Sequence, residues 1–294
     1  MLLENLKSVK FLRVGRVGQI RFSVPEKMNA LTEEIAEDFN TIVSTLRRSP
    51  GNLGAVVITG FPAPVFSAGG DLAFLQRRAD QGRKQHFHQR NSQIMNEFYH
   101  KFLSVRSLPV PTIAAVNGAA IGAGACLALA CDMRVFCDTA KIGFTFVSLG
   151  LHPGMGATHF VSSVAGPEAA FRMLLSGDVV DGREAVQDLR LGSKLVPGDP
   201  ALCVEEATKL GERIARQAPI PMRGCMRSLR NIQDQGLDTA LWREADAQAH
   251  CYATEDMQEG LAALREKRRP NFTSHDMSYT DFFNEGETGM KAKL

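Results

Sequence analysis

The spacing of apolar positions changes along the chain and predicts alternating strands and helices. Residues 9–24 alternate around Gly15 and Gly18, which predicts a β-hairpin that ends at Pro25. Short uninterrupted apolar runs predict further strands at 54–60, 111–118, 134–138 and 192–196. Helical spacing marks the segments between them, at 86–106, 122–131, 154–164 and 167–176. Strands that alternate with helices predict an α/β fold with parallel strand pairing.

A helix is also predicted after the hairpin, from Thr32. Thr32 can cap it, and Glu33 and Glu34 stand in its first turn, where the helix dipole favours acids. Its apolar stripe consists of Ile35, Phe39, Ile42, Val43 and Leu46. This stripe predicts a helix that packs one face on the core.

The pattern becomes purely helical from about residue 200. The expected helices cover 201–217, 221–234, 237–253 and 255–268. We therefore divide the chain into an α/β core at 1–200, a helical C-terminal and oligomerisation segment at 201–272, and a polar tail at 273–294.

Composition narrows the classes of partner. The 294 residues are 44% hydrophobic and 22% charged, with a net charge of +2, which is typical of a globular protein with a packed core. No global field favours nucleic acid or an anionic membrane, and no apolar run approaches the ~20 residues of a membrane span. We expect neither nucleic acid nor membrane as a partner, and a polyanionic ligand would need a local basic cluster.

Cysteines and histidines give no sequence signature of a metal site. The six cysteines form no CxxC pair, so reduced thiols are expected. His86 and His88 stand two apart on a predicted helix and should face different ways, as solvated residues. The sequence thus predicts no metal and no tightly bound cofactor.

The two ends of the chain bear on localisation. The N-terminus contains Glu4 and no apolar signal region, so it does not predict secretion. The final residues Ala292-Lys293-Leu294 are a close variant of the S-K-L peroxisomal signal. We expect a peroxisome-like organelle, with a mitochondrial or cytoplasmic location as the alternative.

Two glycine-rich stretches have a common design. VFSAGGDL (65–72) and NGAAIGAGA (117–125) each follow a predicted strand and lead into a helix. Free amides at such helix starts point outward, and two of them on neighbouring strands can bind one oxygen as an oxyanion hole. Tight helix–sheet packing is the alternative explanation. A nucleotide phosphate loop is not indicated, because its Lys-Ser/Thr pair is absent.

The chain resembles the crotonase superfamily, also called the enoyl-CoA hydratase/isomerase family, over residues 10–272. Five blocks carry the resemblance: VPEKMNAL (24–31), VFSAGGDL (65–72), PTIAAVNGAAIGAGACLALACDMRV (111–135), LGLHPGMGATHF (149–160) and LAALREKRRPNF (261–272). The resemblance implies a crotonase-like ββα spiral core with an all-helical C-terminal segment, in a homotrimer or hexamer. It also implies a fatty or branched acyl-CoA thioester as substrate or ligand, whose enolate the protein stabilises.

The resemblance also implies roles for particular residues. The backbone amides of Gly70 and Ala123 match the oxyanion hole; alanine replaces a more usual glycine, which a negative φ would allow. The residues expected to hold the CoA adenine and ribose are Lys27, Ala68, Asp71 and Leu72. The basic residues expected to meet CoA phosphates are Arg265, Lys267, Arg268 and Arg269.

The sequence departs from the family at both glutamates that hydratases use. Cys126 and Phe146 stand at these positions, and Gly154 is near the place where some relatives carry an aspartate. A positioned acid or base contributes roughly 10²–10⁴ to a rate, so classical hydration should be very slow. Decarboxylation of a malonyl-type thioester needs no base and stays open, as do allylic isomerisation and a non-catalytic acyl-CoA-binding role. An RNA-binding role has no support in charge or aromatics.

Other residues could act at the site. His152 is the titratable candidate near the second missing glutamate, although a packing role is the simpler explanation. Cys126 lies in an apolar helix and is expected to be a buried hydrophobe rather than a nucleophile. Asp71 can serve as a helix cap.

Overall fold

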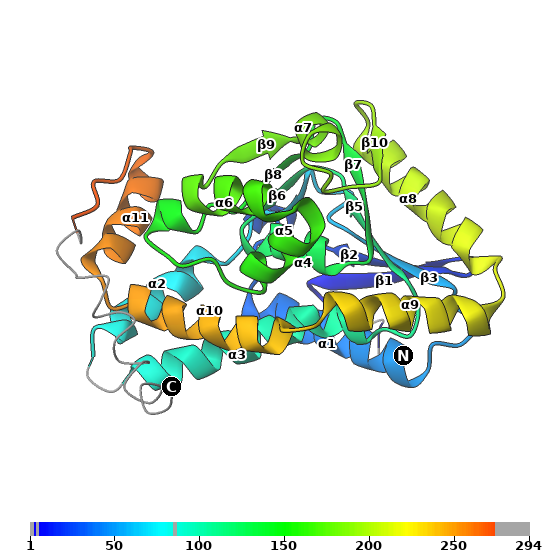
Figure 1. The fold of residues 1–294 in the computed structure, drawn as a ribbon, viewed down its shortest axis with the longest axis horizontal. Coiled ribbons are helices and arrows are strands. Elements are labelled where there is room, and N and C mark those ends of the chain that lie inside the picture. The colour runs from blue at the N-terminus through cyan, green and yellow to red at the C-terminus, as the bar shows by residue number, and fades with distance from the viewer. Residues whose placement is uncertain (1–2, 4–5, 85–86, 274–294) are drawn as a thin grey trace, which may run out of the picture.

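Two β-sheets form the centre of the molecule, with helices packed around them (Figure 1). The computed structural model describes residue 3 and residues 6–84 and 87–273. The larger sheet has the strand order β1 (Val9–Val14), β2 (Val17–Phe22), β3 (Ala55–Thr59), β5 (Thr112–Val116), β7 (Met133–Cys137), β10 (Lys194–Val196). The smaller sheet has the order β4 (Val65–Ser67), β6 (Ala119–Ile121), β8 (Lys141–Gly143), β9 (Val179–Asp181). Among the strand pairs of the described residues, only β1–β2 and β8–β9 are antiparallel.

The chain repeats one unit as it moves across the sheets. A strand of the large sheet is followed by a short strand of the small sheet and then by a helix, as in β3–β4–α2 (Leu72–Gly82) and β5–β6–α4 (Ala123–Ala130). Every residue of β3 and β5 is buried, because structure covers both faces of the large sheet. This arrangement confirms the predicted α/β fold and its ββα spiral.

The N-terminal predictions are confirmed in detail. Val14 pairs with Val17 at the closed end of the β1–β2 hairpin, and Gly15 occupies the turn with φ +57°. Helix α1 (Glu33–Arg48) follows, and the Thr32 hydroxyl accepts a hydrogen bond from the Ile35 amide at 3.1 Å. The five apolar residues of the predicted stripe are all buried.

The short strands of the small sheet are not evident from the sequence. We expected each glycine-rich stretch to run from a long strand directly into a helix, but β4 and β6 intervene and pair with each other. Strands of three residues are too short for an alternating pattern. They form because the spiral brings segments that are distant in sequence side by side.

The C-terminal helices pack on both the sheets and the earlier helices. They are α8 (Pro200–Ala215), α9 (Pro219–Gln233), α10 (Leu237–Cys251) and α11 (Glu255–Glu266). Helix α8 covers strands β3, β5 and β7, whereas α10 lies alongside α3 (His88–Leu103) (Figure 1). Helix α11 ends two residues earlier than predicted because Lys267 takes the left-handed conformation, with φ 54°.

The remaining helices complete the outer layer. They are α5 (Ala157–Ala165), α6 (Pro167–Ser176) and α7 (Gly182–Gln187), with 3-10 turns at Pro25–Lys27, Ser104–Ser107 and Val147–Leu149. Helix α5 starts later than the predicted residue 154, because Met155 and Gly156 both have positive φ. In the described part of the chain, no helix is both long and apolar enough to cross a membrane. The predicted targeting residues Ala292-Lys293-Leu294 lie outside the described residues.

Candidate active site

A cavity of about 750 Å³ opens between the glycine-rich turns and the helices α2, α3, α10 and α11. Most of the residues that the sequence implicated line this one cavity. They are Lys27, Ala68, Gly70, Asp71, Leu72, Ala123, Phe146 and Arg268. Apolar side chains of the first two helices, including Phe74, Leu75, Met95 and Phe98, supply much of the remaining wall. A cavity of this size and character suits an organic ligand with a long apolar portion.

Buried side chains hold the first turn, which carries Gly70. The Asn29 side-chain amide lies 3.3–3.4 Å from the backbone oxygens of Gly60, Val65 and Phe66 and donates to them. The Ser67 hydroxyl donates to the Asn29 carbonyl at 2.8 Å and accepts from the Gly69 amide at 3.2 Å. These bonds hold the turn before α2 in one conformation, so the next amide has a defined direction.

The second turn carries Ala123 at the start of α4. Gly122 precedes it with φ 53° and ψ −119°, a conformation that L-residues with side chains rarely adopt. Ala123 itself does not have positive φ, so the methyl group that replaces the family's more usual hydrogen causes no backbone strain there. The glycine requirement therefore falls on the residue before the amide.

The two turns pack directly against each other. A Cβ built on Gly69, which has φ +95°, would lie 2.5 Å from the Ile121 oxygen and 3.6 Å from the Ala123 nitrogen. Among the described residues, no backbone acceptor binds the amide of Gly70 or Ala123. Both residues line the cavity, so two unpaired donors are available to a ligand oxygen there.

Neither glutamate position supplies a proton-transfer group. Cys126 is fully buried, is not among the lining residues, and directs its sulfur at the Gly154 oxygen at 3.3 Å. Burial, reinforced by the negative charge of Glu244, raises the pKa of the Cys126 thiol well above its usual range. Phe146 does line the cavity, but as an apolar ring.

A polar pair in the cavity wall, formed by Tyr99 of α3 and Gln248 of α10, was not predicted from the sequence. The Tyr99 hydroxyl donates to Gln248 Oε1 at 2.7 Å, and Gln248 Nε2 donates to the His152 carbonyl at 2.8 Å. Burial raises the pKa of Tyr99 well above 10, and the neighbouring Tyr252 and Glu244 raise it further. Tyr99 is therefore a neutral hydroxyl at physiological pH.

This pair also occupies the place near Gly154 where some relatives carry an aspartate. A Cβ built on Gly154 would clash with the Tyr99 hydroxyl and would lie 2.5 Å from Gln248 Nε2. The helical periodicities of α3 and α10 gave no signal for the pair, because the two residues are 149 apart in sequence.

His152 does not line the cavity of the two amides. It lines a neighbouring cavity of about 570 Å³ with residues of α5 and α6, such as Thr158, Ala170 and Phe171. Its Nδ1 lies 2.6 Å from the Pro153 oxygen, and burial lowers the pKa of its imidazole. His152 therefore lines a different cavity from the Gly70 and Ala123 amides, which argues against its predicted role in proton transfer.

Some of the residues expected to hold CoA line the cavity, and others lie outside its lining. Asp71 lines the cavity and also caps α2, because its Oδ1 accepts from the Phe74 amide at 2.8 Å. Arg268 lines the cavity as well, and its guanidinium contacts Glu259 at 2.8 Å and Glu266 at 2.6 Å. The hydrogen bonds with these two acids raise the pKa of Arg268. They also reduce the net positive charge offered to a phosphate.

The other basic residues of this segment lie outside the cavity lining. Arg265 donates to Gln76 Oε1 at 2.7 Å, and Lys267 forms the left-handed end of α11. Both are exposed, as is Arg269. These three residues are close in sequence to Arg268, which lines the cavity, but they can contact only a part of a ligand that extends outside the cavity.

Comparisons with known proteins agree with this architecture. Residues 13–275 match the sequence profile described as enoyl-CoA hydratase/isomerase. A protein named crotonyl-CoA hydratase from Syntrophomonas wolfei is 32% identical over 274 residues, which cover 93% of this chain and 98% of that protein. A short-chain-enoyl-CoA hydratase from Clostridium acetobutylicum is 28% identical, with coverages of 90% and 97%.

Solved structures give the same result. The enoyl-CoA hydratase/isomerase from Pseudoalteromonas atlantica superposes with a TM-score of 0.75 at 26% identity, covering 91% of this chain and all of that chain. The enoyl-CoA hydratase from Bacillus anthracis has a TM-score of 0.68 at 29% identity, with coverages of 90% and 99%. The similarity thus extends over the whole fold and includes both glycine-rich turns.

Proposed function

Because the chain belongs to the enoyl-CoA hydratase/isomerase family, we propose that it binds an acyl-CoA thioester in the 750 Å³ cavity and stabilises the thioester enolate. The thioester oxygen would accept hydrogen bonds from the Gly70 and Ala123 amides. Negative charge builds up on this oxygen as the enolate forms, and donors that are already in position stabilise it. Each such donor increases the rate by a factor of ~10²–10³.

The reaction that fits this cavity best is decarboxylation of a malonyl-type thioester. The observation that carries this choice is that Asp71 is the only carboxylate among the described lining residues, and it caps α2. Hydration and allylic isomerisation both need a positioned base, whereas decarboxylation takes its electrons from a breaking carbon–carbon bond. Relatives named as hydratases support the acyl-CoA class. The absence of an acid at positions 126 and 146 supports a reaction other than hydration.

The proposed reaction is balanced without an added reagent. The bond between the α-carbon and the carboxylate breaks, its electron pair passes to the α-carbon and the thioester oxygen, and CO₂ leaves. The enolate then takes one proton at the α-carbon. We assign this proton to the neutral Tyr99 hydroxyl, one of several protic groups in the lining, and the resulting phenolate recovers a proton from water.

Parallel assays test the proposal. Purified protein is incubated with malonyl-CoA or methylmalonyl-CoA, and separately with crotonyl-CoA, and the products are separated by chromatography. We expect decarboxylation to be the faster reaction, because hydration lacks two groups that each contribute roughly 10²–10⁴ to its rate. Faster hydration than decarboxylation would reject the assignment. Micromolar acyl-CoA binding without any turnover would support the non-catalytic alternative.

Two variants test whether the Tyr99 hydroxyl or the Cys126 thiol takes part in the reaction. Tyr99→Phe should slow decarboxylation if the hydroxyl delivers the proton, and it should leave acyl-CoA affinity nearly unchanged. Cys126→Ser should keep the wild-type rate, because this buried thiol does not reach the cavity. A large loss in Cys126→Ser with normal folding would instead point to a role for the thiol.

A further inference from the structure

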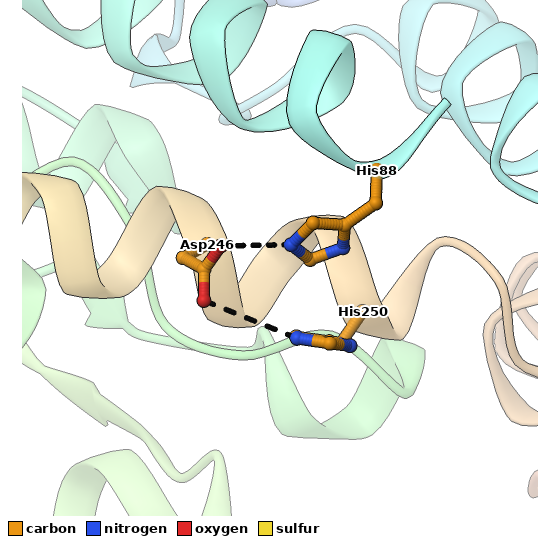
Figure 2. A group of neighbouring side chains, drawn as sticks. All are labelled: His88, Asp246 and His250. Atoms are coloured by element: carbon orange, nitrogen blue, oxygen red, sulfur yellow. Dashed lines mark hydrogen bonds and ion pairs between the residues drawn. The ribbon is translucent and has the colours of Figure 1, made fainter. Parts of the chain in front are cut away.

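Three potential metal ligands meet on the surface where helices α3 and α10 pack together (Figure 2). His88 is the first residue of α3, and Asp246 and His250 are one turn apart on α10. His88 Nε2 lies 2.7 Å from Asp246 Oδ1, and His250 Nε2 lies 3.9 Å from Asp246 Oδ2. The three potential ligand atoms all lie within 4.8 Å of one another.

The two imidazole rings converge on this single carboxylate. Their centroids are 4.0 Å apart, and each ring directs a nitrogen at one of the carboxylate oxygens (Figure 2). From the sequence, His88 was expected to be a solvated residue that faces away from His86, which lies outside the described residues. The group gives no sequence signal because His88 and Asp246 are 158 residues apart.

We propose that His88, Asp246 and His250 bind one divalent transition-metal ion, with Zn²⁺ as the representative, and that water completes the coordination shell. Imidazole nitrogens with a carboxylate oxygen are a donor set that suits Zn²⁺ and disfavours Mg²⁺, which prefers oxygen ligands alone. The proposal does not depend on the proposed acyl-CoA chemistry.

The geometry needs only small side-chain adjustments to hold the ion. Zinc ligands lie about 2.0–2.1 Å from the metal, so neighbouring ligands of a tetrahedral site are about 3.3 Å apart. The observed nitrogen–oxygen distances of 2.7 and 3.9 Å fall on either side of this value. The side chains of His88, Asp246 and His250 are 40%, 58% and 36% exposed, so an ion can reach them from solvent.

A bound ion would link two helices that also form the cavity wall. Tyr99 lies on α3, and Gln248 lies on α10 between Asp246 and His250 in sequence. The metal would hold the first turn of α3 against the last turns of α10, so binding to the folded state should stabilise it.

Zinc titration of the full, untagged chain tests the site. All proteins carry Cys225→Ser, because the exposed Cys225 thiol could bind Zn²⁺ by itself. Calorimetry with ZnCl₂ should detect one ion per chain, and Zn²⁺ should raise the melting temperature. His88→Ala and His250→Ala should each weaken binding at least about tenfold, since even changes in residues behind the ligands cost 10–100-fold. Mg²⁺ should neither bind nor stabilise.

His159→Ala is the matched control, because it removes a histidine of α5 that contacts the Gln233 oxygen and lies outside this group. Its Zn²⁺ affinity should equal that of the parent. The proposal is overturned if the Cys225→Ser parent binds no Zn²⁺, or if His88→Ala binds it as tightly as the parent. Circular dichroism of each variant verifies the fold before titration.

Discussion

The backbone of Gly122 decides whether the Ala123 amide, the second donor of the proposed oxyanion hole, can face the cavity. Its φ of 53° and ψ of −119° orient the peptide that carries the Ala123 nitrogen. A Cβ at Gly122 would have room, since the nearest atom outside its neighbours is Phe146 Cζ at 3.9 Å. The constraint is therefore conformational, and a side chain would favour rotation of the peptide away from this orientation.

Gly122→Ala should consequently impair activity, although the added methyl group meets no steric clash. We expect about 1–3 kcal/mol of backbone strain and a loss of roughly 10²–10³ in turnover, as one oxyanion donor moves away. Denaturant unfolding and steady-state kinetics measure the two effects. Gly224→Ala is the control, because Gly224 lies within α9 with no atom near its built Cβ, and its turnover should be unchanged. Normal turnover in Gly122→Ala would contradict the role of the amide.

Helix α2 connects the turn that carries Gly70 to the apolar wall of the cavity. Asp71 caps it, and its first two turns place Leu72, Phe74 and Leu75 on the lining. Capping of this helix therefore affects both stability and the ligand site. Helix α8 also has an aspartate cap, since Asp199 Oδ1 accepts from the Ala201 amide at 2.8 Å. No residue of α8 is among the described lining residues.

Comparison of the two caps separates stability from ligand binding. Asp71→Ala and Asp199→Ala should each lower the free energy of unfolding by about 1 kcal/mol, which is the usual effect of a lost cap. Only Asp71→Ala should also weaken acyl-CoA binding in calorimetry. Equal acyl-CoA affinities in the two variants would show that the start of α2 does not contribute to the ligand site.

A buried ion pair joins the C-terminal helices to the α/β core. Arg230 of α9 contacts Asp132 at 2.6 Å, with side chains only 8% and 16% exposed, and it also donates to the Arg106 and Leu108 carbonyls. Burial alone would raise the pKa of Asp132, but hydrogen bonds from Arg230 and Thr112 outweigh it and lower the pKa. The ionised carboxylate is thus a folded-state contact between distant parts of the chain.

The contribution of this ion pair to the free energy of unfolding should decrease at acidic pH. Since the folded-state pKa of Asp132 is lowered, its stabilisation is complete above the unfolded value of about 3.9 and is lost as the pH falls toward the folded value. Asp132→Asn should destabilise the protein by roughly 3 kcal/mol at neutral pH. Urea unfolding should show this difference from the wild type narrowing below about pH 5. A difference that is constant with pH would contradict the assignment.

We predict that several copies of the chain associate. Family resemblance implies a trimer or a hexamer, and α6 leaves Phe171 and Leu175 about 70% exposed beside the His152 cavity. Large apolar side chains exposed together often mark contact surfaces. Light scattering should give the mass of three or six chains, and Phe171→Asp should lower it. A monomeric wild type would reject the prediction.

Much of the fold and the two turns of the candidate site could be predicted from the sequence because they depend on local chemistry. The strand and helix periods, the Thr32 cap and the two glycine-rich turns are properties of neighbouring residues, whereas the choice of Gly70 and Ala123 within those turns came from the family resemblance. The sequence also shows directly that positions 126 and 146 carry a cysteine and a phenylalanine and no acid. Local patterns suffice where the backbone conformation itself is the functional feature.

Only the tertiary structure decided which side chains surround those two amides. It placed Tyr99 and Gln248 in the cavity wall, directed His152 to another cavity, and brought His88 to Asp246 and His250. Each of these outcomes depends on how α3, α5 and α10 pack against elements that are far away in sequence. The periodicity of one helix specifies which face is buried, but it carries no information about the partner that this face meets.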